Sequence, residues 1–204
     1  MKYDTIIFDL GGVLIDWNPD YVFTHLIPDA DRRRFFFDNV CTHDWNLEQD
    51  AGRSLAVATD ELLEKWPEWE VEIRAFYGRW EEMLGGPLDE TVALLQALKE
   101  RTGYRLLALT NWSAETFPIA LDHYAFLHWF EGIVVSGAEK TRKPFAAIYE
   151  LLLKRYAVAP ERAVFIDDNL ANVQAAEGAG IKGIHFRNAK TLRQALAEHG
   201  FVIP

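Results

Sequence analysis

With 204 residues, half of them hydrophobic and a quarter charged, the chain fits one soluble domain or one domain with a sizeable insertion. Its formal net charge of −10 argues against nucleic-acid binding through a broad basic surface, and its single cysteine, Cys41, excludes an internal disulfide. We expect a cytoplasmic protein without membrane contact: Asp4 and Asp9 precede any long apolar run, and no stretch approaches the roughly 20 apolar residues of a membrane helix.

The first predicted strand lies in "KYDTIIFDL", residues 2–10, and ends in a lone carboxylate, Asp9. Two glycines, Gly11 and Gly12, follow it. If Asp9 is a nucleophile, a second carboxylate is expected at residue 11, where this chain has none. The rest of the sequence has to show whether that gap changes the reaction or only slows it.

Residues 17–84 have a different pattern from the rest of the chain. They hold five of the seven tryptophans and helical patterns such as "PDADRRRFFFDNV" (28–40) and "TDELLEKWPEW" (59–69). We therefore predict a helical insertion, a cap, whose tryptophans mainly form its own core. The segment 43–53, "HDWNLEQDAGR", is the part expected to reach over the site, with Trp45 as a substrate contact.

From residue 85 onward, short apolar runs alternate with helical patterns. Strands are predicted at 104–110, 132–136, 163–167 and 183–186, and helices at 91–103, 117–130, 146–158 and 170–180. Such alternation implies right-handed crossovers and a parallel sheet covered on both faces. Residues 1–16 and 85–204 would form this α/β core, and residues 17–84 the cap.

Polar residues follow three of the predicted strands. Asp9 ends the first, Thr110 and Asn111 end the second, and Asp167 and Asp168 end another. Ligands of an open parallel sheet bind outside the carboxyl ends of its strands, so these three clusters are expected to meet at one edge. Each cluster alone would be explained as a helix cap, but three together favour an active site.

The chemistry that these residues favour is phosphoryl transfer. Asp9, Asp167 and Asp168 would repel one another, and a divalent cation with oxygen ligands, Mg²⁺, would relieve that repulsion. Thr110 offers a hydroxyl at a helix start, suited to phosphate oxygens. Lys143, fixed by the following proline, is the cation expected to balance the remaining charge.

In these residues the chain resembles the haloacid dehalogenase superfamily. In particular, it is similar to the phosphatases of that superfamily that have a helical cap after the first strand, such as the sugar-1-phosphate phosphatases. The resemblance rests on Asp9 with "GGV", Thr110–Asn111, "KPFAAIY" from Lys143 and "FIDDNLANVQAA" from Phe165, in the family's order. It implies an α/β fold with a Rossmann-like parallel sheet core and an inserted α-helical cap.

The same resemblance implies roles for individual residues. Asp9 would be the nucleophile that carries an aspartyl-phosphate and a ligand of Mg²⁺, the expected cofactor. The main-chain carbonyl of Gly11 and the Asp168 carboxylate would complete the protein's metal ligands. Asp167 would bind the metal directly or through water, with Asn172 beside it. Thr110, Asn111 and Lys143 would hold the phosphoryl group, with Lys143 also catalytic.

The departure from the family pattern is Gly11, where most of its phosphatases have an aspartate that acts as acid and base. A replacement donor is expected from Asp16, or from His43, Asp44 or Glu48 in the cap. Without the usual acid, a leaving group that is a weak base is favoured. We therefore expect a small phosphorylated metabolite as substrate, with a sugar 1-phosphate preferred; the sequence carries no signal for an oligomeric state.

The sequence alone leaves two alternative functions open. A metal-independent 2-haloacid dehalogenase needs no carboxylate at residue 11, but the Asp167–Asp168 pair would be unfavourable beside a carboxylate substrate. A phosphate-binding protein with little catalysis would also explain Gly11, but not the retained nucleophile, lysine and acidic pair.

Overall fold

Five parallel strands form the central sheet of the computed structural model, which describes residues 2–203. They are β1 (Thr5–Phe8), β4 (Arg105–Thr110), β5 (Gly132–Val135), β6 (Ala163–Asp167) and β7 (Lys182–His185). Their order is β5-β4-β1-β6-β7, which places the first strand of the chain at the centre. The predicted α/β fold with a parallel sheet is confirmed.

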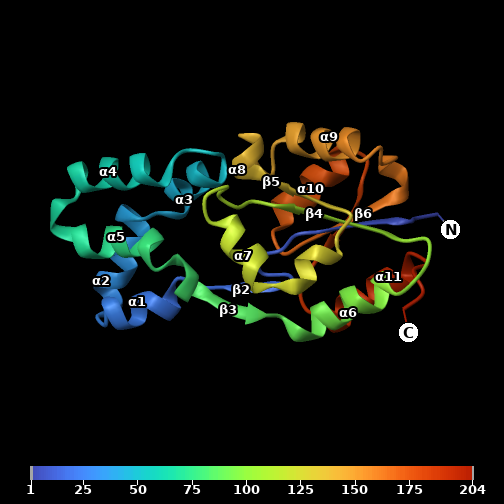
Figure 1. The fold of residues 1–204 in the computed structure, drawn as a ribbon, viewed down its shortest axis with the longest axis horizontal. Coiled ribbons are helices and arrows are strands. Elements are labelled where there is room, and N and C mark those ends of the chain that lie inside the picture. Colours follow the sequence, from blue (N-terminus) through green and yellow to red (C-terminus); the bar gives the residue numbers. More distant parts are fainter. Residues whose placement is uncertain (1, 204) are drawn as a thin grey trace.

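Both faces of the sheet are buried, as expected for strands that are apolar throughout. Ile6 and Phe8 pack into one part of the core, whereas Ile7 packs into the other, because successive side chains point to opposite faces. Helices α6 (Asp89–Lys99) and α11 (Ala189–Glu198) pack together on one side, and α9 (Ala146–Arg155) and α10 (Leu170–Gly178) on the other (Figure 1).

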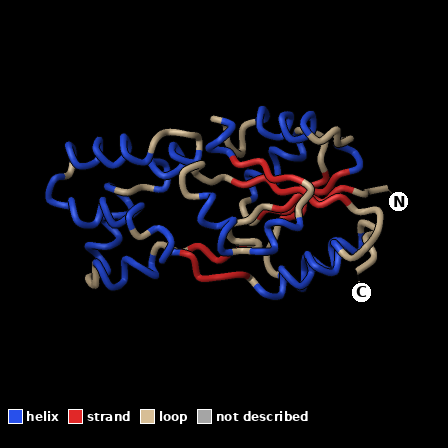
Figure 2. The backbone as a smooth tube through the Cα atoms, in the orientation of Figure 1, coloured by secondary structure: helices blue, strands red, loops and turns tan. Residues whose placement is uncertain are grey.

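The helices of residues 20–78 form a second lobe beside the sheet, at the end opposite both termini (Figures 1 and 2). They are α1 (Asp20–Leu26), α2 (Ala30–Phe35), α3 (His43–Asp50), α4 (Leu55–Lys65) and α5 (Glu70–Gly78). Aromatic rings fill the interior of this lobe. Phe36, for example, has its ring centroid 5.1 Å from that of Phe23 and 5.3 Å from that of Trp69.

A two-stranded antiparallel ribbon joins the lobes. It pairs β2 (Ile15–Trp17) with β3 (Leu84–Pro87), so both crossings of the chain lie side by side. The predicted boundaries at residues 16/17 and 84/85 fall inside these two strands. Neither strand was predicted, because each is too short and too mixed in polarity to show a period.

Further elements are α7 (Phe117–His123), α8 (Ser136–Glu139) and the short helical turns Phe36–Val40, Pro67–Trp69, Trp80–Met83, Ala125–Trp129 and Pro160–Arg162. The single helix predicted over 117–130 is wrong, because Tyr124 has extended backbone and separates α7 from the turn after it. Helices α8 and α11 were not predicted. None of the described helices has the length and apolar character needed to cross a membrane.

Candidate active site

The polar residues at the carboxyl ends of β1, β4 and β6 meet at one edge of the sheet, facing the cap. They line a cavity of about 340 Å³, which also has cap residues in its wall. The core contributes Asp9, Gly11, Thr110, Asn111, Arg142, Lys143, Asp168 and Asn172, and the cap contributes His43, Asn46, Leu47, Asp50 and Tyr77. The two lobes therefore enclose the candidate site between them.

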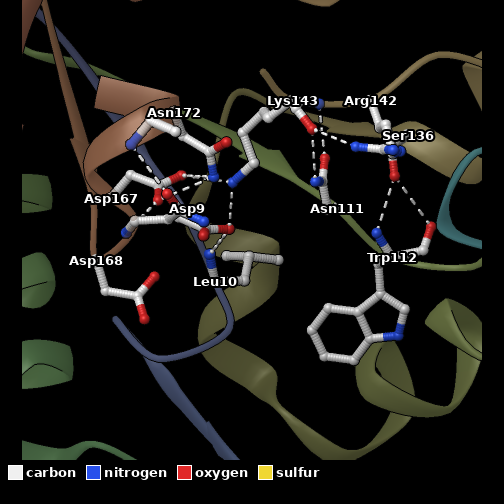
Figure 3. Close-up of polar contacts among 12 residues, drawn as sticks. Asp9, Leu10, Asn111, Trp112, Ser136, Arg142, Lys143, Asp167, Asp168 and Asn172 are labelled. Atoms are coloured by element: carbon white, nitrogen blue, oxygen red, sulfur yellow. Dashed lines mark hydrogen bonds and ion pairs between the residues drawn. The ribbon is translucent and has the colours of Figure 1, made fainter. Parts of the chain in front are cut away.

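Lys143 lies at the base of this cavity, 1% exposed, between two carboxylates. Its Nζ is 2.9 Å from Asp9 Oδ1 and 2.7 Å from Asp167 Oδ2 (Figure 3). Burial alone lowers the pKa of Lys143, but the two carboxylates outweigh burial and raise it. The lysine is therefore held charged beside the predicted nucleophile.

Asn111 fixes the main chain of Lys143. Its Oδ1 accepts a hydrogen bond from the Lys143 N–H at 2.8 Å, and its Nδ2 donates to the Lys143 carbonyl at 3.0 Å. Both polar atoms of the amide are thus used within the protein. The expected phosphate contact of Asn111 stays a prediction, since Asn111 lines the cavity; the structure adds that its side chain positions Lys143. Thr110, almost fully buried, lines the cavity directly.

Asp167 is held by its neighbours from several directions. Besides Lys143, it accepts hydrogen bonds from Asn172 Nδ2, at 3.1 Å to each oxygen, and from the Asn169 N–H at 2.8 Å. The Tyr149 hydroxyl donates to the Asn172 carbonyl, which fixes that helix end in turn. The fully buried Asp167 carboxylate is therefore satisfied without a metal ion.

Asp168 differs from Asp167 in both exposure and contacts. In Figure 3 its carboxylate points away from the lysine network and has none of the contacts drawn there. Asp9, Asp167 and Asp168 nevertheless each have a possible ligand atom within 4.8 Å of the others. Burial raises the pKa of Asp9 and of Asp168, and the charge of Asp167 adds to both shifts. A divalent cation among these oxygens would offset the repulsion, so the residues present fit Mg²⁺.

The two glycines after Asp9 have different environments. Gly12 has φ +71°, and a Cβ there would lie 2.5 Å from Asp168 Oδ2, so only glycine lets the Asp168 carboxylate approach the loop. Gly11 has no positive φ, and a Cβ there would have no atom within 4 Å. Residue 11 therefore has space for a side chain that the chain does not use.

Helix α3 presents one face to the cavity. His43, Asn46, Leu47 and Asp50 line it, at positions i, i+3, i+4 and i+7, which share one side of a helix. Trp45, expected at the substrate, is placed elsewhere: its ring packs on Phe76 with centroids 5.3 Å apart, and its indole N–H donates to the Ala58 carbonyl. Trp45 therefore belongs to the cap interior, and Trp17, Trp80 and Trp112 line the cavity instead.

Of the four side chains expected to replace the missing acid, the structure places one at the cavity. His43 lies at its rim, whereas Asp44 and Glu48 are exposed on other faces of α3 and do not line it. Asp16, on the connecting ribbon, accepts a hydrogen bond from the hydroxyl of Tyr21 in α1 and does not line the cavity.

Asp50 was missed, although the spacing 43/46/47/50 was a signal in the sequence that would have found it. Its carboxyl is partly buried in the cavity wall, and burial raises its pKa to about 7 despite the opposing charges of Arg142 and Lys143. Asn46 Nδ2 lies 3.4 Å from Asp50 Oδ2, and Asn46 in turn accepts a hydrogen bond from Tyr77. The cap thus brings a fixed, weakly acidic carboxyl to the site.

Comparison with known proteins shows similarity to one enzyme family over most of the chain. A family model described as haloacid dehalogenase-like hydrolase matches residues 3–180. The sesquiterpene phosphatase astK of Aspergillus oryzae is 26% identical, over 92% of this chain and 91% of its own length. The phosphorylated carbohydrates phosphatase of Thermotoga maritima is 23% identical, over 89% and 84%.

A solved structure has the same fold at low identity. It is a family enzyme of Bacteroides thetaiotaomicron in complex with magnesium and inorganic phosphate, with a TM-score of 0.69. It is 22% identical and is aligned over 91% of this chain and 95% of its own. This likeness shows that the two chains share a fold.

Proposed function

The chain belongs to the haloacid dehalogenase-like hydrolases, and we propose that within this family it is a Mg²⁺-dependent phosphatase of a small phosphorylated metabolite, acting through an aspartyl-phosphate on Asp9. The observation that carries this proposal is the contact of buried Lys143 with Asp9 beside two further carboxylates. A nucleophilic carboxylate, a fixed cation and a set of oxygen ligands are the parts that phosphoryl transfer needs.

In this mechanism one Asp9 oxygen attacks phosphorus while the bond to the leaving oxygen breaks. Lys143 neutralises negative charge as the phosphoryl group moves, and Thr110 offers its hydroxyl to a phosphate oxygen. Water then attacks the aspartyl-phosphate, which releases phosphate and restores Asp9. Positioned charges stabilise such a step without reorganisation.

The residues that would hold Mg²⁺ are Asp9, Asp168 and the Gly11 carbonyl, with Asp167 and Asn172 acting through water. Of the two neighbouring aspartates, Asp168 is assigned the direct contact, because Asp167 is already hydrogen-bonded by Lys143, Asn169 and Asn172. Bound there, the ion would neutralise phosphate oxygens and draw the substrate against Asp9. The magnesium and phosphate in the similar Bacteroides structure support Mg²⁺ as the cofactor.

The cavity wall supports a sugar phosphate as the finer substrate class. Trp17, Trp80 and Trp112 offer apolar ring faces, and Asn46, Asp50 and Arg142 offer hydrogen-bonding groups. Such a combination suits a ring that is apolar on its faces and carries hydroxyls at its edge. The name of the Thermotoga relative agrees with a carbohydrate. Within this class a sugar 1-phosphate is proposed, because its leaving group is a weaker base than an alkyl alcohol and needs less help from an acid.

The test is release of phosphate from a panel of metabolite phosphates and p-nitrophenyl phosphate, with Mg²⁺ and with EDTA. Mg²⁺-dependent turnover that is lost in Asp9→Asn is the expected result. Phosphate binding without turnover across the panel would contradict it, as would full activity of Asp9→Asn. Halide release from chloroacetate in EDTA would point to the dehalogenase instead.

A further inference from the structure

We propose that Asp50, on cap helix α3, is the general acid and base of this site and protonates the leaving group in the place of a carboxylate at residue 11. The inference rests on the proposed phosphatase function and assigns the proton-transfer step within it. It makes the cap a part of the catalytic site, beyond covering the sheet edge.

The first observation is the position of Asp50. It lines the same cavity as Asp9, Gly11 and Lys143, approached from the cap side. In an in-line transfer from the substrate to Asp9, the leaving oxygen lies on the side of phosphorus away from Asp9, toward the cavity and its cap wall. A carboxyl in that wall is suitably placed for the departing oxygen.

The second observation is that Asp50 has no cationic partner of its own. None of the ion pairs found among residues 2–203 includes Asp50, although Arg142 and Lys143 are near enough to influence it. Its hydrogen-bonding contacts are neutral: a main-chain hydrogen bond with Ser113 and the long contact from Asn46 Nδ2. Partial burial of a carboxyl without a cationic partner costs stability, and groups of this kind concentrate at functional sites.

The third observation is that the surrounding side chains hold Asp50 in place. Gln49 Nε2 donates to the Tyr77 hydroxyl at 3.1 Å, Tyr77 donates to Asn46 Oδ1 at 2.8 Å, and Asn46 Nδ2 faces Asp50. Next to Asp50, Gly52 packs so closely against the Gly137 carbonyl that an added Cβ would lie 2.8 Å from it. The end of α3 is therefore seated on the core.

The protonation state fits the role. The titratable and charged groups that share the cavity with Asp50 are Asp9, Asp168, Arg142, Lys143, His43 and Tyr77. Burial raises the pKa of Asp50 and outweighs the two cations and the Ser113 main-chain hydrogen bond, so the carboxyl keeps a proton at neutral pH more readily than an exposed one does. His43 lies at the exposed rim of the same helix face, so it serves as the competing candidate to be tested.

The proton balance of the proposed cycle closes. As the Asp9–phosphorus bond forms and the bond to the leaving oxygen breaks, the Asp50 proton passes to that oxygen. The Asp50 carboxylate then takes a proton from the water that attacks phosphorus, while the bond to Asp9 breaks. Asp50 ends the cycle protonated, and no further reactant is needed.

The experiment compares Asp50→Asn with the wild type on two esters, with Mg²⁺. Glycerol phosphate has a leaving group that needs a proton, whereas the p-nitrophenolate of p-nitrophenyl phosphate does not. Asp50→Asn is expected to lower kcat/KM for glycerol phosphate about 10²–10⁴-fold and to change that for p-nitrophenyl phosphate by less than about threefold. Glu48→Gln, on an exposed face of the same helix, is the matched control, and His43→Gln tests the competing donor.

Two further readouts distinguish acid catalysis from a structural role. The wild-type rate on glycerol phosphate should fall relative to that on p-nitrophenyl phosphate as pH rises through about 7, and this fall should be absent in Asp50→Asn. Gly11→Asp, introduced together with Asp50→Asn, should restore turnover of glycerol phosphate, because residue 11 has space for a side chain. Because the pH profile is measured on the wild type, this test holds even if a variant misfolds.

Equal losses on both esters, no loss in Asp50→Asn, or a selective loss in His43→Gln instead would overturn the assignment of Asp50. Failure of the wild type to release phosphate from either ester with Mg²⁺ would contradict the proposed phosphatase function itself. The two failures are therefore distinguishable.

Discussion

Asn111 and Lys143 are joined by two hydrogen bonds that run in opposite directions, from the Lys143 N–H to Asn111 Oδ1 and from Asn111 Nδ2 to the Lys143 carbonyl. An amide side chain here acts like a neighbouring peptide group. It connects the loop after β4 to the loop that carries the lysine, so the position of the Lys143 ammonium depends on Asn111.

Replacing Asn111 by Ala should therefore reduce phosphatase activity through misplacement of Lys143. Small misplacements of a catalytic group cost about 10²-fold in rate, and that loss is expected in kcat/KM for p-nitrophenyl phosphate. Asn39→Ala, which removes an exposed amide in the cap, is the control and should retain activity. An unchanged rate in folded Asn111→Ala would show that Lys143 does not need this support.

The acidic group at the sheet edge predicts a stability that depends on Mg²⁺. Binding to the folded state alone adds about 2.7 kcal/mol at a concentration of 100 Kd, so the unfolding midpoint should rise as Mg²⁺ is added. Asp168→Asn should require roughly 10–100 times more Mg²⁺ for the same rise, since it removes a ligand from the charged set. Calorimetry with and without EDTA measures both effects; equal Mg²⁺ responses in the two proteins would contradict the ligand assignment.

The two glycines of "DLGGV" should respond differently to the same small substitution. Gly12→Ala forces a residue with a Cβ into a positive φ and against Asp168, so a loss of about 1–3 kcal/mol in unfolding free energy is expected. Gly11→Ala meets no atom and has no such backbone constraint, so its effect should stay within about 0.5 kcal/mol. Denaturant unfolding of both variants without Mg²⁺ decides this, and equal destabilisation would contradict the geometry of the loop.

The raised pKa of Asp50 predicts a pH dependence of stability. The folded protein binds a proton at Asp50 up to about pH 7, whereas the unfolded chain loses it near pH 3.9. Between these values the native state holds more protons, so the Asp50 contribution makes the protein less stable as pH rises and levels off above about pH 7. The unfolding temperature of Asp50→Asn, measured relative to that of the wild type, should therefore rise between pH 5 and pH 8. A difference independent of pH would show that Asp50 ionises normally.

The position of the candidate site at one edge of the sheet was predictable from the sequence, because parallel strands bring their carboxyl ends together. Asp9, Thr110 and Asp167 each end a run of apolar residues, and that pattern alone implied that they would meet. The contact between Asn111 and Lys143 was not predictable in this way, since it joins two loops 32 residues apart.

The cap residues at the site depend on how α3 is rotated against the core. Trp45 and Asp50 lie on the same helix, and the sequence-based prediction named Trp45 as a substrate contact. The aromatic interior of the cap takes the face with Trp45, which leaves the face with Asn46 and Asp50 for the cavity. That choice is made by packing between elements distant in sequence, which local patterns do not contain.

The central place of β1 sets an order of events during synthesis of the chain. Thr5 pairs with Arg105 on one side and with Ala163 on the other, so the first strand made is among the last to be completed. At about 5–20 residues per second, the ribosome needs on the order of 10–30 s between these segments. The cap sequence is contiguous and is available to fold during that wait. The strand that carries Asp9 meanwhile has apolar edges without partners, and such edges are open to pairing with other chains.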